Sequence, residues 1–300
     1  MPTLKGQNFR VITFDSATGY YKCIGMATNC KVTLTANTES STTKDDIGIA
    51  DKPVVVSKGW QVSVDSLDVM DMAAILSAMK SLTPFQISWD ETSTTDNQTA
   101  VSTGIARGGL AYLSDATFTF DDRTNSSKSL QFIGTGPLDG VNIATTVMPL
   151  GSYTKGQFVR LYLANNNTAT PDKVIASAKT LSFHVSIGME TATTKDTQGD
   201  WQVQEPVSLA YDISTSALMK GSDVITSTVQ AQTIADLNSI YELSNPVKFQ
   251  IANVSGNNQR TKGAVIVSGS VVITNLELNG PNRQNADYTA SLNGYGEYTV

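Results

Sequence analysis

The sequence predicts a mainly β protein with one helix per domain, built as two tandem copies of an antiparallel β-sandwich or open barrel. A repeat is the first observation. Residues 38–45 (TESSTTKD) recur as residues 189–196 (METATTKD), 151 positions later (195 − 44) in a chain of 300. Each copy follows an apolar run of period two, and each half holds one helical pattern. A near-match at half the chain length predicts a duplicated domain, with copies at residues 1–145 and 150–300.

Composition supports β structure and argues against several function classes. Charged residues are 16% of the chain, aromatic residues are 7%, and the formal net charge is −6. This balance lacks the basic footprint of a protein that grips nucleic acid. Cys23 and Cys30 are too few for a disulfide scaffold, so we expect small buried side chains in a reducing compartment. The sequence shows no apolar export signal at its start and no run long enough to span a membrane.

In the first half, short alternating runs separated by turn residues predict strands. Met72, Leu76 and Met79 recur at helical spacing and predict one helix, which Pro84 ends. The expected order is strands 9–14, 31–36 and 60–64, a helix over 72–82, and strands 85–89, 109–120 and 132–136.

The second half repeats this order of elements. The expected elements are strands 158–163, 181–187 and 210–213, a helix over 234–243, and strands 249–251, 269–278 and 292–296. Two short matches act as register marks: Lys-Gly-Gln at 5–7 and 155–157, and Phe-Gln-Ile at 85–87 and 249–251. The linker is expected at 137–154, and polar loops at 90–99 and 255–261.

The sequence offers little catalytic chemistry. Its one histidine, His184, lies in an alternating strand, and we expect a structural side chain on the polar face. Paired carboxylates at 45–46 and 121–122 are expected to be solvated loop charges, and Met70, Met72 and Met79 to form a core stripe. Nucleophile elbows, phosphate loops and metal-finger spacings are missing from the sequence. We expect no enzyme activity, no metal and no cofactor.

The residues around the repeated loop are similar to those of a known family. The pattern is an alternating strand, a Glu- and Thr-rich loop with Thr-Lys-Asp, a Trp and a Pro, then a strand and a helix. The first half matches it with 38–45, Pro53 and 58–65 (KGWQVSVD), and the second with 190–196, Trp201 and Pro206. The chain thus resembles the major tail protein of long-tailed bacteriophages, the tail tube subunit. It departs from the usual subunit by carrying two tail-tube-type domains, and by placing Trp ahead of Pro in the second half.

The resemblance implies a structural virion protein of the tail, assembled in the host cytoplasm, whose main partner is itself. Such subunits form rings of six domains whose sheets join edge to edge into an inner β-barrel, and the rings stack into a tube. Two domains per chain then imply three chains per ring. The long loops would reach the neighbouring subunit and the next ring. The expected contact residues are Glu39, Thr42, Thr43, Lys44, Asp45, Trp60, Glu190, Thr193, Thr194, Lys195, Asp196 and Trp201.

The acidic balance suits a conduit, because a lumen without basic patches would let DNA slide without sticking. DNA and the tape-measure protein would pass through without specific binding, and other tail proteins would bind the tube ends. No membrane partner is expected. Two alternatives stay open. One is a β-sandwich adhesin or fibre module of a virion or cell surface, and the other is a tube enclosed by a contractile sheath.

Overall fold

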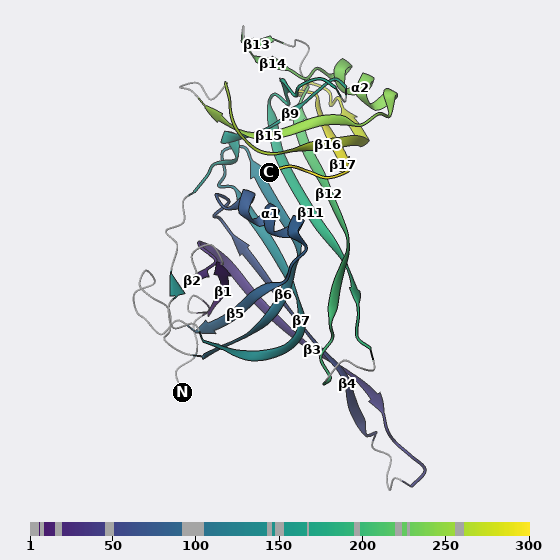
Figure 1. Cartoon of the computed structure of the whole chain (residues 1–300). Coiled ribbons are helices and arrows are strands. Elements are labelled where there is room, and N and C mark those ends of the chain that lie inside the picture. Colours follow the sequence, from purple (N-terminus) through teal and green to yellow (C-terminus); the bar gives the residue numbers. More distant parts are fainter. Residues whose placement is uncertain are drawn as a thin grey trace.

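The structure is a computed structural model, and it describes residues 6, 9–15, 20–45, 51–91, 105–142, 146–147, 153–166, 168–194, 199–219, 224–226, 229–255 and 261–300. The molecule is elongated and mainly β (Figure 1). Its first half forms strands β1 (Phe9–Asp15), β2 (Tyr20–Cys23), β3 (Ala27–Ser40) and β4 (Pro53–Ser66), helix α1 (Met72–Ser81), and strands β5 (Phe85–Glu91), β6 (Ile105–Asp121), β7 (Ser127–Asn142) and β8 (Thr146–Val147).

The second half begins with a 3₁₀ turn, Gly156–Phe158, and then repeats the order of elements. It forms β9 (Val159–Leu163), β10 (Lys173–Val174), β11 (Ala178–Thr191), β12 (Gln204–Leu218), β13 (Val224–Thr226), β14 (Val229–Ala231), α2 (Ile234–Leu243), β15 (Val247–Ser255), β16 (Thr261–Asn279) and β17 (Asp287–Gly294).

The strands pair in the same way in both halves. The first-half ladder runs β3–β4–β7–β6–β5–β1–β2. The second runs β11–β12–β17–β16–β15–β9–β10, and every pairing in both ladders is antiparallel. The mainly β fold with one long helix per half, expected from the sequence, is confirmed.

Alternation places one face of the long strands in the core. In β4, Trp60, Val62 and Val64 are buried, while the intervening Gln61 and Ser63 are half-buried. Because successive side chains of a strand point to opposite faces, this pattern gives each sheet one apolar and one polar face. The largest buried side chains on the apolar side include Phe118, Phe132, Phe183 and Phe249.

The helices match in length and in how they end. α1 buries Met72, Leu76 and Met79, one face of a helix of period 3.6. Both helices end on a left-handed residue, Leu82 and Ser244, each with φ 51°. They differ at the start, because only α2 has a capping box, formed by Thr233 and Asp236.

In each half, an aromatic side chain packs against two glycines, an arrangement we call the aromatic–glycine stack. The sets are Trp60 on Gly109 and Gly134, and Tyr211 on Gly269 and Gly294. A Cβ added to these glycines would come within 2.0 to 3.0 Å of the aromatic side chain. Trp60 and Tyr211 are 151 residues apart (211 − 60), the spacing of the repeated loop. Tyr211 is therefore the counterpart of Trp60, and the expected correspondence of Trp60 with Trp201 is wrong.

The Phe-Gln-Ile register mark is also wrong, by two residues. Gly109 pairs with Ile87, whereas its counterpart Gly269 pairs with Phe249. Phe249 thus corresponds to Ile87 and not to Phe85. The faces are unaffected, because a shift of two keeps each side chain on its own side of the sheet.

Several strands are longer than expected. β3 continues to Ser40 and β4 begins at Pro53, so much of the predicted polar loop is a strand hairpin. Residues 34–40 are all exposed, and without a buried face they carry no alternation to recognise. β7 runs to Asn142, into the expected linker. The polar loops predicted at 90–99 and 255–261 lie largely outside the described residues. In the described part of the chain, none of the helices is long and apolar enough to cross a membrane.

Candidate assembly surfaces

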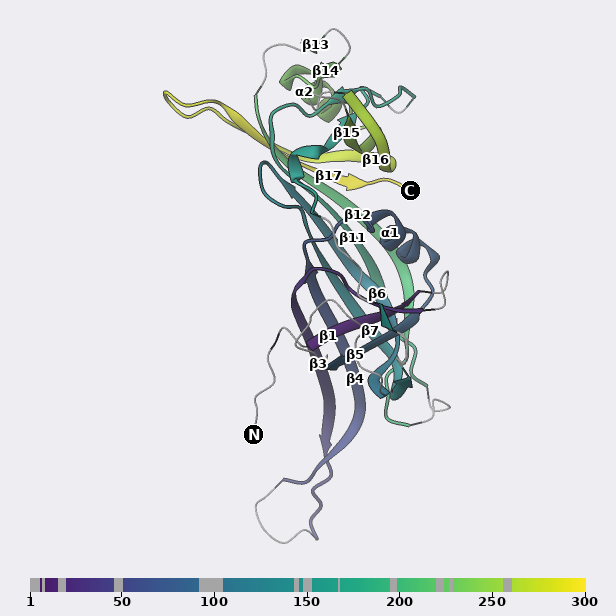
Figure 2. The ribbon, with the colours of Figure 1, turned by 90° about the vertical axis from the view of Figure 1, so that its left-hand side faces the viewer.

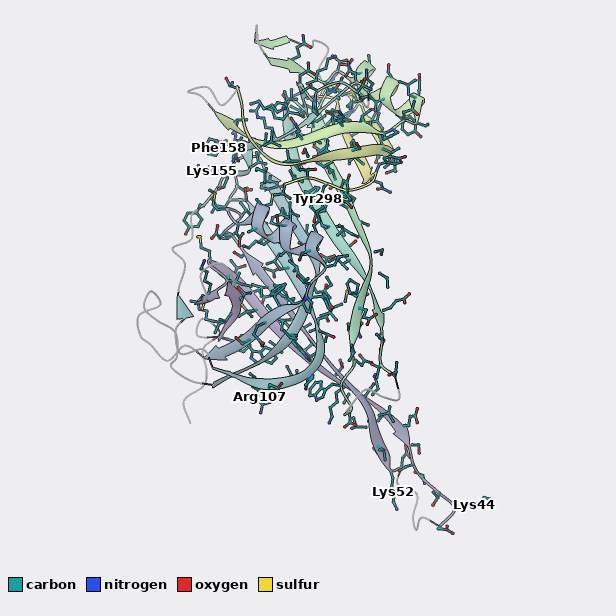
Figure 3. The ribbon with its side chains drawn as sticks, viewed as in Figure 1. Lys44, Lys52, Arg107, Lys155, Phe158 and Tyr298 are labelled. Carbon is teal, nitrogen blue, oxygen red and sulfur yellow. The ribbon has the colours of Figure 1, made fainter. Side chains whose placement is uncertain are left out.

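The β3–β4 hairpin projects well beyond the rest of the molecule (Figures 1 and 2). Five predicted contact residues lie at its outer end, and all are exposed: Glu39, Thr42, Thr43, Lys44 and Asp45. Lys44 and Lys52 mark the tip in Figure 3. The hairpin is therefore positioned to contact another molecule.

A carboxylate organises the tip. Asp51 accepts hydrogen bonds from the hydroxyls of Ser40 and Thr42, the latter at 2.6 Å. These bonds from Ser40 and Thr42 hold the pKa of Asp51 below its usual value of 3.8. The backbone adds two bonds: Ser41 N–H donates to the Lys52 carbonyl at 2.9 Å, and Lys52 N–H donates to Thr42 Oγ1 at 3.0 Å.

The second copy of the repeated loop makes the same two bonds. Ala192 N–H donates to the Val203 carbonyl at 2.8 Å, and Val203 N–H donates to Thr193 Oγ1 at 3.1 Å. Glu190 and Thr194 are exposed beside them. The predicted contact residues Lys195 and Asp196 lie outside the described residues.

This second loop lies against the first half of the same chain. Gln202 N–H donates to the Lys58 carbonyl at 2.8 Å, and Gly136 N–H donates to the Gln202 carbonyl at 2.9 Å. Lys58 Nζ pairs with Asp200 at 3.1 Å and lies 6.0 Å from the centre of the Trp201 ring. The described contacts of Trp201 are thus within its own chain, between the two halves.

Trp60 is a core residue. Its side chain is 3% exposed, packs 5.7 Å from Trp89, and donates from Nε1 to the Gly136 carbonyl at 3.2 Å. Because a side chain enclosed by its own chain cannot contact another subunit, the prediction of Trp60 as a contact residue is wrong. In the sequence, a Trp close to a Thr-rich loop looks the same whether its side chain is buried in the core or exposed for contact with another subunit.

The two halves join edge to edge. β6 of the first half pairs antiparallel with β11 of the second, from Asp115 opposite Ser186 to Asp121 opposite Thr180. The apolar face of this junction carries side chains that are all 0% exposed: Ala116, Phe118, Phe183 and Val185. The sequence does not reveal this junction, because nothing in the residues of β6 and β11 shows which edge of each strand is left unpaired within its own half.

The opposite face of the joined sheet is polar and acidic. Paired residues of neighbouring strands share a face, so the register places carboxylates from several strands on it: Asp65, Asp115, Asp121, Asp212, Glu277 and Asp287. Ser129 Oγ donates to Asp65 at 2.7 Å, and Lys179 Nζ donates to Asp287 at 2.6 Å. Ser, Thr and Asn side chains fill most of the remaining positions on this face.

His184 lies on this polar face, as predicted, between two carboxylates. Its Nδ1 is 2.7 Å from Asp212 and its Nε2 is 2.7 Å from Asp115. Burial opposes protonation of the imidazole, but the hydrogen bonds and charges of Asp115 and Asp212 outweigh it and raise the pKa of His184. The two partners come from β6 and β12, which only the folded sheet brings to β11. Among the described residues, no His, Cys, Asp and Glu side chains form a group that could hold a metal ion.

Comparison with known protein families finds a match to the second half. Residues 159–300, just under half of the chain, match the model of the family described as phage tail tube protein. The second half of the chain is thus similar to phage tail tube proteins. The matched residues cover β9 to β17 and α2, so they include the β11–β12 hairpin, the β16–β17 hairpin and the β11 edge of the junction.

Three solved structures are each similar to about half of this chain. One is from the tail of an empty gene transfer agent particle, refined with C6 symmetry, at 16% identity and TM-score 0.38, covering 49% of this chain and 97% of that chain. One is from the virion of a native gene transfer agent, at 17% and 0.37, covering 49% and 97%. The third is the SPP1 tail tube, at 16% and 0.35, covering 47% and 75%. No curated protein sequence matches the chain.

Proposed function

We propose that this chain is the subunit of a bacteriophage tail tube, a structural virion protein without enzyme activity, and that it carries two tail tube domains at residues 1–145 and 150–300. The family match over residues 159–300 carries the proposal. The first half has the same strand pairings and the same aromatic–glycine stack, which supports a second copy of that domain.

Three chains would form one ring of six domains. Within a chain, β6 and β11 already join two domains side by side, with a continuous sheet and a buried apolar face. Repeating this junction between chains would continue the sheet until it closes, which removes all free edges. Stacked rings would form a tube in the virion tail, assembled in the host cytoplasm, with other tail proteins at its ends.

The polar, acidic face of the joined sheet would line the lumen. Its opposite face is the apolar one that packs into the core, so closure turns the carboxylates inward. DNA carries dense negative charge, and a face on which carboxylates outnumber lysines, with Lys179 paired to Asp287, repels it. DNA and the tape-measure protein would therefore pass without specific binding.

The projecting hairpin would hold one ring to the next. Glu39, Thr42, Thr43, Lys44 and Asp45 are exposed at its end, far from the body. The second copy of the loop lies against the same chain through Lys58 and Gly136. Each three-chain ring would therefore extend three projecting hairpins, one from each chain.

Electron microscopy of the purified protein tests the proposal. We expect rings with six lobes seen from above, stacked into tubes seen from the side. A protein that stays monomeric, or that forms a trimer binding glycan, would contradict it and favour an adhesin or fibre module. A sheath around tubes isolated from virions would retain the tube role and identify a contractile tail.

A further inference from the structure

The junction inside the chain is a template for the contact between chains. In the β6–β11 ladder, Ala116 lies opposite Val185 and Phe118 opposite Phe183. If the halves are copies, the second half has its own equivalent of β6, and the first half its own equivalent of β11. The matched ladders identify these strands as β16 and β3.

Two bulges fix the correspondence residue by residue. β6 has an extra residue, Ser114, whose hydroxyl donates to the Gln131 carbonyl at 3.1 Å. β16 has the same bulge at Thr274, whose hydroxyl donates to the Ser291 carbonyl at 3.2 Å. The offset between these strands is 160 (274 − 114), and between β3 and β11 it is 151, as the repeated loop shows.

Both equivalent strands have an unpaired edge in the described structure. β3 pairs only with β4, and beyond Val271 the β16 strand pairs only with β17. Figure 2 shows the β16–β17 hairpin extending from the side of the molecule. Leu34 on β3 is 56% exposed and Leu278 on β16 is 47% exposed.

The counterparts of these two leucines are fully buried in the internal junction. Leu34 corresponds to Val185 and Leu278 to Phe118, and both counterparts are 0% exposed. Tyr241 lies three residues before the left-handed end of α2, as Met79 does in α1, yet Tyr241 is 48% exposed and Met79 is 1% exposed. Large apolar side chains that are exposed in one half, while their counterparts in the other half are buried, indicate a surface that binds a partner.

We propose that β16 of one chain pairs antiparallel with β3 of a second copy, in the register of the internal junction. This rests on the proposed ring. The register places Leu276 opposite Leu34, Leu278 opposite Val32 and Gly280 opposite Cys30. The opposed pairs bury apolar side chains on one face of the sheet.

The polar face of the proposed pairing is complementary in charge. Glu277 lies opposite Thr33, and Lys31 is its diagonal neighbour opposite Asn279. Diagonal neighbours on a sheet face lie within reach of long side chains. Glu277 and Lys31 are both exposed in the isolated chain, so each is available to the other.

A glycine supplies an independent sign of the same contact. Gly156 lies at the junction, where a Cβ would come within 2.2 Å of the Asp121 carbonyl. Gly6 is its counterpart in the Lys-Gly-Gln match, yet a Cβ on Gly6 has nothing within 4 Å among the described atoms. The turn that receives Gly156 also recurs, since Arg123 and Arg283 share φ 62° and 61°. Gly6 would therefore pack on the turn at 281–286 of the neighbouring chain.

Disulfide trapping tests the register with the native Cys30. Directly opposed residues on antiparallel strands have Cα atoms about 4.5–5.5 Å apart, within disulfide range. Oxidised rings of Gly280→Cys should run as a covalent trimer that reducing agent returns to monomer. Leu276→Cys is the matched control, because it shares the face but lies about 13 Å further along the strand. It should give at least tenfold less trimer.

The outcomes separate the two proposals. Rings in which Gly280→Cys gives no trimer, or in which Leu276→Cys gives as much, overturn the register and leave the tail tube role standing. Absence of rings in the wild-type chain overturns the proposed function and this pairing with it.

A glycine pair provides the second measurement. Gly156→Ala should lower the melting temperature of the chain, because its Cβ meets the backbone of Asp121. Gly6→Ala should leave the melting temperature unchanged and reduce the yield of rings. A normal ring yield from Gly6→Ala would overturn the placing of Gly6 on a neighbouring chain.

Discussion

At the scale of single residues, the aromatic–glycine stacks explain why glycine occupies the middle of long strands. Because Gly134 has no side chain, the Trp60 ring can lie against the backbone of β7. Trp60 also forms a hydrogen bond to Gly136, so the ring joins β4 firmly to β7. In the second half, the Tyr211 hydroxyl donates to the Ser270 carbonyl of β16 at 2.6 Å, which joins β12 to β16.

Gly134→Ala should therefore destabilise the first half. The new Cβ would lie 2.0 Å from the Trp60 ring, so the ring must move, and overpacking of this kind costs about 1–3 kcal/mol. Urea denaturation measures the loss of unfolding free energy. Gly280→Ala, measured like Gly134→Ala on the monomeric chain so that the proposed contact with a neighbour is absent, is the control, because nothing described lies within 4 Å of its Cβ. Equal stability of the two variants would contradict the stack.

His184 should make stability depend on pH. Its pKa in the folded chain lies above the ordinary value of 6.5. The stabilisation by Asp115 and Asp212 is thus fully present below pH 6.5 and lost as pH rises through the folded pKa. Thermal melts across that range should show a fall in melting temperature that His184→Gln removes. An unchanged pH profile in His184→Gln would contradict the assignment.

At the scale of elements, the two copies of the repeated loop have the same internal bonds but different surroundings. Thr42 and Thr193 each accept a backbone N–H, from Lys52 and Val203. The first loop ends a projecting hairpin, whereas the second contacts its own chain at Lys58. The two copies of the hairpin thus have different environments, one projecting from the molecule and one packed against the same chain.

Deletion of residues 42–49 should leave folded rings that do not lengthen. The deletion removes the projecting tip and leaves the β3 and β4 ladder in place. Thr193→Ala is a control, because it removes one bond from the loop that lies within its own chain. Electron microscopy scores tube length in both variants. Tubes of normal length from the deletion would count against stacking through this hairpin.

Sequence patterns predicted elements well wherever one face is buried. β4, β11 and both helices were found because their apolar spacing matches the period of a strand or helix. The outer half of β3 was missed because both of its faces are exposed. Trp60 was misplaced because neighbouring residues in the chain do not reveal the glycines of β6 and β7 beneath it.

At the scale of the whole molecule, the duplication could be recognised from the sequence because the two loop copies, 151 residues apart, are still similar. Both copies make few packing contacts, so little in the fold requires their residues to differ. The internal junction was not readable. Which strand edge meets which depends on the order of strands in the finished sheet, and no local pattern records that order. The same limit hid the partners of His184, which lie 69 and 28 residues away.

The most direct measurement is a cryo-EM reconstruction of the tubes with only threefold symmetry imposed. The account predicts three chains per ring, six tail tube domains, and projecting hairpins that alternate with loops held within their own chain. A ring of six separate chains, or six equivalent projecting hairpins, would contradict it.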